Sequence, residues 1–131
     1  MTATNLQATG TRKDAAVSFL RLAASGRARE GFSRYAAPGF RHHNVHFPTD
    51  AGSLMAAMDE NARQHPEKAL IVKHVLEDGD LVAVHSHVRH DASEPGFALL
   101  HLFRFEGDLI AELWDLAQAV PEKSPNEYGM F

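Results

Sequence analysis

The sequence predicts an α+β fold, in which helices cover one side of a curved antiparallel sheet. In the first half of the chain, apolar residues recur at the three- and four-residue spacing of helices. From about residue 69 onward the pattern becomes extended. Two turn signals, Asp78-Gly79 and Gly107-Asp108, divide this part into two hairpins. Helices followed by consecutive hairpins are typical of an antiparallel sheet with its helices on one face.

Length and composition narrow the class of protein. The 131 residues fit one domain, and we expect residues 1–131 to fold as a unit with residues 1–11 flexible. The net charge of −4 argues against a nucleic-acid partner, and the absence of cysteine argues against disulfides and thiolate metal sites. The sequence shows no signal-peptide pattern and no apolar run of about 20 residues, so we expect a cytoplasmic protein without a membrane partner.

Two helices are predicted before residue 38. The first begins near Lys13, where apolar residues start to recur at helical spacing. It ends at Gly26, because glycine is common at helix C-termini. The recurring apolar residues are Ala16, Val17, Phe19, Leu20 and Ala23. The second helix is predicted over residues 27–36, and it stops before Pro38 because proline disfavours helical backbone in the residue preceding it.

A histidine-rich stretch, FRHHNVHFPTD, separates the second helix from a third. It lacks a helical period, so we interpret it as a short strand that leads into a loop. His42 and His43 are adjacent and point apart in extended backbone, and we expect His43 to face the interior, with Asn44 as a local hydrogen-bonding partner. A third helix follows and ends at His65-Pro66. Its candidate caps are Thr49, Asp50 and Ser53.

The two hairpins supply four long strands, which curl as they twist. Their sequences are ALIVKHVLEDGDLVAVHSHVRHD and GFALLHLFRFEGDLIAELWDLAQAV. A curled sheet covered by three helices leaves a cone with an open mouth, which suits a small apolar ligand. The tail, PEKSPNEYGMF, is expected to run extended over the surface.

Four stretches carry a resemblance to a known family: RHHN, GDLVAVHSHVR, LFRFEGDLIAELWD and VPEKSPNEYGMF. Over about residues 12–131 the chain resembles the SnoaL-like branch of the nuclear-transport-factor-2-like (NTF2-like) superfamily. His42 stands where that branch usually has glutamine. The resemblance implies the cone fold, also called cystatin-like, and a homodimer. It leaves the activity open, because this fold hosts cyclases, isomerases, hydrolases and binding proteins.

The resemblance also implies a catalytic pair. The best-known SnoaL-type members are polyketide cyclases that close a ring by intramolecular aldol condensation. They use an aspartate late in the last strand as acid/base, with a histidine on the neighbouring strand. The match to LWD places the aspartate at Asp115, and the match around FR places the histidine at His101.

The chemistry of this pair depends on its position. An apolar pocket disfavours the charged form of a carboxylate. The carboxylate therefore becomes a stronger base and can act as a general base near neutral pH. A nearby histidine can donate a hydrogen bond or return the proton. Asp115 and His101 share a face if the turn at Glu106-Gly107-Asp108 has three loop residues. A strict two-residue loop would split the pair. We predict the three-residue loop.

Other side chains are candidates for substrate binding: Tyr35, His43, His85, His87 and Phe103. Tyr35 could equally pack against the sheet. His85 and His87 alternate along one strand, as in some metal sites, and could hold zinc or iron with Asp115 and another histidine. The resemblance favours histidines that bind polar ligand groups instead. We therefore expect no metal and no cofactor.

Two classes of function are compatible with these features. The first is a cofactor-free enzyme that moves protons on a small apolar carbonyl compound, of the cyclase, isomerase or hydratase type. The second is a non-catalytic domain that binds a small ligand in the same cone. In either case we expect a homodimer through an apolar face of the last two strands. That face consists of Leu100, Leu102, Trp114 and Leu116.

Overall fold

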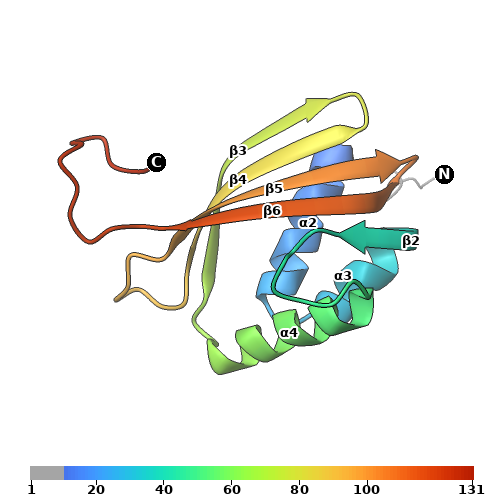
Figure 1. The fold of residues 1–131 in the computed structure, drawn as a ribbon, viewed down its shortest axis with the longest axis horizontal. Coiled ribbons are helices and arrows are strands. Elements are labelled where there is room, and N and C mark those ends of the chain that lie inside the picture. The colour runs from blue at the N-terminus through green and yellow to red at the C-terminus, as the bar shows by residue number, and fades with distance from the viewer. Residues whose placement is uncertain (1–10) are drawn as a thin grey trace.

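The computed structural model describes residues 11–131, so nearly all of the segment predicted to be flexible, residues 1–11, lies outside this range. The described elements are, in chain order, α2 (Arg12–Ala24), α3 (Ala28–Tyr35), β2 (Ala36–His42), α4 (Ala51–Gln64), β3 (Ala69–Asp78), β4 (Leu81–Arg89), β5 (Phe97–Glu106) and β6 (Leu109–Ala119). Figure 1 shows a curved sheet with α2, α3 and α4 gathered on one side of it. The predicted α+β class and the three helices are therefore confirmed.

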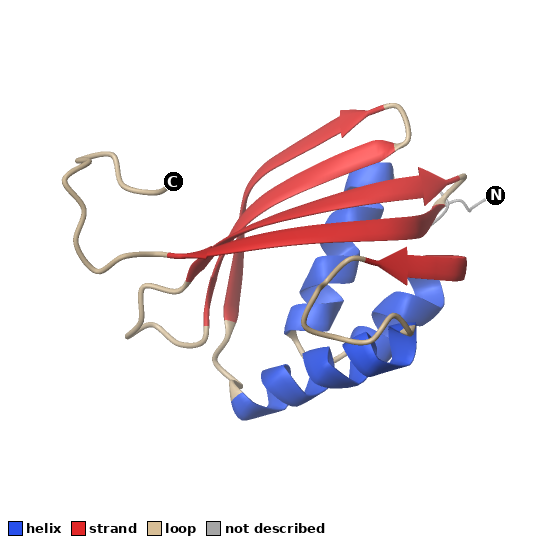
Figure 2. Ribbon diagram, viewed as in Figure 1, coloured by secondary structure: helices blue, strands red, loops and turns tan. Residues whose placement is uncertain are grey.

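The sheet has five strands in the order β2-β6-β5-β4-β3. The strands from β3 to β6 form antiparallel pairs, as predicted. β2, in contrast, runs parallel to β6, so the sheet is not purely antiparallel. α4 lies between β2 and β3 in the chain, and it carries the backbone from one edge of the sheet to the other (Figure 2).

Local sequence signals account for the helix starts. Thr11 caps α2 in a reciprocal capping box with Asp14. Of the three candidate caps for α4, Asp50 is the one used, and its side chain accepts the backbone N–H of Ser53 at 2.7 Å. Each cap satisfies backbone donors that the first helical turn leaves without partners.

The hydrophobic core lies between the helices and one side of the sheet, which we call the helix-facing side. Phe19 of α2 is fully buried, and its ring meets Phe32 and Phe103 edge to face at centroid distances of 5.1 and 6.0 Å. On β4 the even-numbered residues are buried here: Val82, Val84, Ser86 and Val88. The odd-numbered residues of β4 therefore point to the opposite side, which we call the outer side.

The last hairpin differs from the prediction in a way that matters for the site. The turn contains two residues, Gly107 and Asp108, and not three. Phe105 pairs with Ile110, whereas Arg104 pairs with Glu112, so Ala111 is an extra residue in β6. This β-bulge shifts the alternation by one position and restores the alignment that a two-residue turn alone would have lost.

The C-terminal tail returns to the sheet at its last residue. The Phe131 ring stacks on His87 at a centroid distance of 4.4 Å, and Lys73 Nζ lies 5.3 Å from the centre of the same ring. Phe131 thus covers part of the outer side. The rest of the tail differs from the predicted extended surface segment, because residues 127–130 form a turn and residues 121–129 are exposed. Within residues 11–131, no helix has both the length and the apolar character needed to cross a membrane.

Candidate functional site

His101 and Asp115 are directly opposite each other on neighbouring strands. β5 and β6 pair them residue to residue, and both positions lie on the helix-facing side. The neighbouring pair on the same side is Phe103 and Leu113, and both of those residues are buried in the core. The structure therefore brings the predicted catalytic pair together, through the bulge and not through the predicted loop.

His101 is a buried histidine with an unused hydrogen-bonding atom. Only 8% of its surface is exposed, and Nδ1 has no partner within the described chain. Its ring stacks on Phe103, with centroids 6.2 Å apart. Burial lowers the pKa of His101 from 6.5 to about 4, although the charge of Asp115 opposes this effect. The imidazole is therefore neutral near pH 7, with one N–H to donate and one nitrogen to accept.

Asp115 is half-buried and is held by an amide. Asn44 Nδ2 donates to Asp115 Oδ2 at 3.0 Å. Within residues 11–131, no arginine or lysine forms an ion pair with this carboxylate. The same part of the chain offers no hydrogen bond to Oδ1. One oxygen thus fixes the orientation of the carboxylate, and the other is available to a ligand.

The loop after β2 positions Asn44 through His42. His42 Nε2 donates to the Pro48 carbonyl at 2.9 Å, and Nδ1 accepts the Asn44 backbone N–H at 3.2 Å. His42 is buried and both of its nitrogens are occupied, so it holds the loop. The expectation that His43 would be the inward histidine is not met. His43 lies on the other side of the sheet.

Ser86 is a polar residue of this side that the sequence analysis missed. It is fully buried, and its Oγ has no hydrogen-bond partner in the described structure. β4 places Ser86 opposite Leu99 and Val84 opposite His101, so Ser86 and His101 are diagonal neighbours. A signal was present, since Ser86 interrupts an alternating series of inward valines. Together, His101 Nδ1 and Ser86 Oγ are two buried polar atoms that a ligand could satisfy.

The outer side holds three of the predicted ligand-binding histidines. His43 Nε2 donates to Glu112 at 2.6 Å, and its ring stacks on Trp114. His85 Nδ1 lies 3.0 Å from His74 Nδ1, and the His87 ring stacks on the Phe131 ring. These positions differ from the expectation that His43, His85 and His87 would line the cone.

The residues that were candidates to bind zinc or iron therefore lie on opposite sides of the sheet. His85 and His87 are on the outer side, whereas His101 and Asp115 are on the helix-facing side. Among residues 11–131, no three histidine, aspartate or glutamate side chains are grouped so that they could hold a metal ion.

The two remaining candidates pack into the core. Tyr35 is half-buried at the end of α3, packs against the core, and carries the Arg34 guanidinium 5.2 Å from its ring centre. Phe103 is fully buried between Phe19 and His101. Phe103 thus packs against the His101 ring and has no exposed surface that a substrate could contact.

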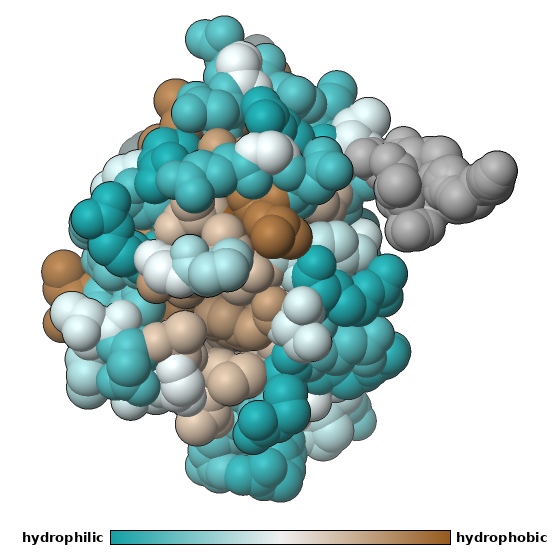
Figure 3. Space-filling view, turned by 90° about the vertical axis from the view of Figure 1, so that its right-hand side faces the viewer, coloured by the Kyte–Doolittle hydropathy of each residue, from teal (hydrophilic) through white to brown (hydrophobic). Residues whose placement is uncertain are grey.

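Two of the pockets formed by the described residues are lined by neither His101 nor Asp115. One, of about 600 Å³, lies among α3, β2 and the start of α4, with Phe32, Phe40 and Met55 in its wall. Figure 3 faces this end of the molecule and shows an apolar hollow with hydrophilic residues around it. The other pocket, of about 420 Å³, lies near the ends of α2 and α4.

Comparisons with known proteins agree on the fold. No family model and no curated protein matches the sequence. A candidate SnoaL-like polyketide cyclase from Jannaschia sp. CCS1 is 15% identical, with a TM-score of 0.65 over 81% of this chain and 84% of that one. A candidate ketosteroid isomerase from Kribbella flavida is 19% identical, with a TM-score of 0.65 over 89% of this chain and 85% of that one. An NTF2-like protein of unknown function from Cytophaga hutchinsonii is 14% identical, with a TM-score of 0.65 over 82% of this chain and 90% of that one.

At such identities a structural likeness establishes the fold and does not transfer an activity. The fold that the sequence resemblance implied is confirmed. The chain therefore has the same fold as solved structures described as NTF2-like and SnoaL-like.

Proposed function

We propose that the chain is a small cofactor-free enzyme that transfers protons on a small, apolar carbonyl compound, of the cyclase, isomerase or hydratase type. The observation that carries this proposal is the direct pairing of Asp115 with a buried, neutral His101 on the helix-facing side. The structural relatives described as a polyketide cyclase and a ketosteroid isomerase lend support, because both names denote chemistry at carbon next to a carbonyl.

The proposed reaction begins at Asp115. Its free oxygen removes a proton from the carbon beside a carbonyl, the C–H bond breaks, and the electron pair moves to the carbonyl oxygen. The neutral His101 N–H and the Ser86 hydroxyl are the nearby donors for that oxygen, and donors of this kind lower the energy of an oxyanion. In an aldol closure the enolate carbon then attacks a second carbonyl. The protonated Asp115 returns the proton to the new alkoxide.

The fixed geometry supports the role of Asp115 as the base. Asn44 holds one carboxylate oxygen, and His42 holds Asn44 through the loop. A base that is already oriented loses little freedom when the substrate binds. The apolar neighbours on the same side favour a substrate with a largely apolar body.

A non-catalytic ligand-binding domain is the second candidate, and one observation favours it. Asp115 is half-buried, whereas a strongly activated base is usually enclosed in an apolar site. The free atoms of His101 and Ser86 could hold the polar end of a ligand without any turnover.

In either case we propose a homodimer through the outer side of β5 and β6. Leu100 and Leu116 are paired across the two strands and are 40% and 69% exposed, and none of the described helices covers them. Two copies that meet there would remove this apolar surface from water.

Proton exchange into small carbonyl compounds tests the enzyme proposal. The protein is incubated in D₂O with a panel of apolar ketones and diketones, and NMR follows the loss of the protons beside the carbonyl. We expect faster exchange for at least one compound, a return to background in Asp115→Asn, and no change in Asp108→Asn, which alters an exposed carboxylate in the adjacent turn. Binding of a compound without exchange would support the ligand-binding domain instead.

A further inference from the structure

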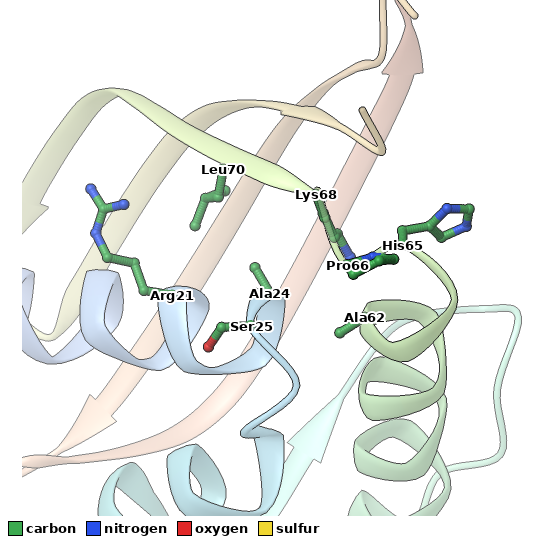
Figure 4. Close-up of a pocket in the computed structure, with 8 residues that line it drawn as sticks. All are labelled: Arg21, Ala24, Ser25, Ala62, His65, Pro66, Lys68 and Leu70. Atoms are coloured by element: carbon green, nitrogen blue, oxygen red, sulfur yellow. The ribbon is translucent and has the colours of Figure 1, made fainter. Parts of the chain in front are cut away.

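A polar pocket lies away from the proposed catalytic pair. It has a volume of about 420 Å³ and is bordered by the last residues of α2, the end of α4 and the beginning of β3. Figure 4 shows Arg21 toward one end of this pocket and Lys68, Pro66 and His65 toward the other, with Ala24 and Leu70 between them. Neither His101 nor Asp115 lines it, so what it binds does not depend on the proposed function.

The ionisable side chains of this pocket are all basic. Arg21, His65 and Lys68 line it, and no aspartate or glutamate does. Lys68 is partly buried, and its Nζ donates to Asn61 Oδ1 at 2.6 Å. Across residues 11–131, no carboxylate forms an ion pair with Lys68 or Arg21. A partly buried ammonium whose protein partner is a neutral amide is poorly compensated for the water it has lost.

The helix ends do not account for these cations. Basic side chains near a helix C-terminus often serve its terminal carbonyls. Here the Ser25 N–H bonds to the carbonyls of Arg21 and Leu22, and the His65 N–H bonds to those of Asn61 and Ala62. Within residues 11–131, the Lys68 side chain donates only to the Asn61 amide, and the Arg21 side chain donates to no carbonyl, so both heads are available to a ligand.

The pocket also has apolar walls and one ring that is held in place. Ala24, Leu70 and Pro66 contribute the apolar surface between the charged heads. His65 is stacked on His90 of the β4–β5 loop, with ring centroids 3.8 Å apart. This stacking limits the motion of the imidazole at the edge of the pocket, so His65 can report on its occupancy.

We propose that this pocket binds a small organic anion. Its carboxylate or phosphate oxygens contact the Lys68 ammonium, and its apolar body lies over Ala24 and Leu70 toward Arg21. Charge-assisted hydrogen bonds to the oxyanion provide the compensation that Lys68 lacks within the chain. Asn61 keeps the Lys68 side chain in position when the ligand leaves.

Titration at constant ionic strength tests this proposal. Isotope-labelled protein is titrated with butyrate and, separately, with inorganic phosphate, and NMR follows the His65 ring and the Lys68 side chain. We expect saturable shifts of both groups, with a Kd of about 1 mM for the better probe. Stronger binding of butyrate identifies an organic carboxylate as the ligand, and stronger binding of phosphate identifies a phosphate ester.

Matched variants localise the binding. Lys68→Gln keeps a donor for Asn61 but loses the charge, and should weaken binding about tenfold or more. Arg21→Gln is an exposed substitution that should weaken binding by a smaller factor, and it keeps the test decisive if Lys68→Gln does not fold. Lys13→Gln makes the same charge change at the other end of α2 and should have no effect. Equal effects of Lys13→Gln and Lys68→Gln, or shifts that do not saturate with either probe, would overturn the proposal.

Discussion

On each side of the β5–β6 hairpin a histidine lies beside a carboxylate of β6, and the two pairs differ in how many of their polar atoms have hydrogen-bond partners. On the outer side, Glu112 accepts from His43 at 2.6 Å and from Arg104 at 3.1 Å, with Arg41 at 3.4 Å. On the helix-facing side, His101 and Asp115 are paired by register without a hydrogen bond between them.

The electrostatics follow from this difference. The hydrogen bond from His43, supported by Arg104 and Arg41, holds the pKa of Glu112 below its ordinary value. Trp114 covers the His43 ring, so the outer pair is closed by its own neighbours. His101 instead has an unpartnered buried nitrogen and a pKa of about 4. A pair with satisfied partners stabilises the fold, whereas a buried polar atom without a partner is retained at a cost to stability. This contrast is the reason for assigning function to the inner pair.

The largest expected effect distinguishes the two carboxylates by activity. Asp115→Asn removes the base and preserves its shape, so the rate on a compound found in the exchange assay should fall by about 10² to 10⁴. His101→Gln should lower the rate by a smaller factor. Glu112→Gln should leave the rate near that of the wild type and lower the Tm, because it breaks a satisfied cluster. If Glu112→Gln lowered the rate as much as Asp115→Asn, the assignment of roles to the two sides would be wrong.

The next effect concerns pH. Between pH 6.5 and about 4, the unfolded chain binds a proton at His101 that the folded chain does not bind, so stability rises with pH in this range. The part of the unfolding free energy that depends on a neutral His101 is fully present above pH 6.5 and is lost as the pH falls toward 4. The loss amounts to about 3 kcal/mol. Urea unfolding of wild type and His101→Gln from about pH 7 to pH 4.5 measures it. Parallel pH profiles for the two proteins would contradict the buried, neutral state of His101.

A third prediction concerns the apolar part of the outer side. Leu116→Glu places a charge in the proposed dimer contact and should raise the dimer dissociation constant by about 100-fold. Leu76→Glu is the matched control, since Leu76 is also 69% exposed but lies on β3, outside the proposed contact. Sedimentation or light scattering over a range of concentrations measures both. A wild-type protein that is monomeric at micromolar concentration would rule out this dimer.

The smallest effect concerns Ser86. Ser86→Ala removes a buried hydroxyl without a partner, so the free energy of unfolding should stay the same or rise by up to about 1 kcal/mol. The same change should lower the exchange rate by about tenfold if the hydroxyl donates to the substrate oxygen. A variant that is less stable but fully active would show that Ser86 is structural.

The sequence by itself determined the elements and the signals that begin them. Asp14 and Asp50 act within one helical turn, so their capping roles can be predicted locally, although Thr49 and Ser53 competed with Asp50 as candidates. The change from helical to alternating periodicity also depends only on neighbours in the chain. The side of the sheet on which His85 and His87 lie can also be predicted from the sequence. Both histidines alternate with Val82, Val84 and Val88, so if the valines point inward the histidines point outward.

Only the tertiary structure decided which residues meet. The pairing of His101 with Asp115 depends on the bulge at Ala111, and one residue more or less in β6 would move Asp115 to the outer side. The parallel addition of β2 turns His42 inward and His43 outward, and it brings Asn44 to Asp115 across 71 positions of the chain. Register and strand order result from packing the whole sheet against the helices. A local pattern of alternation is equally compatible with either register, and so it cannot predict them.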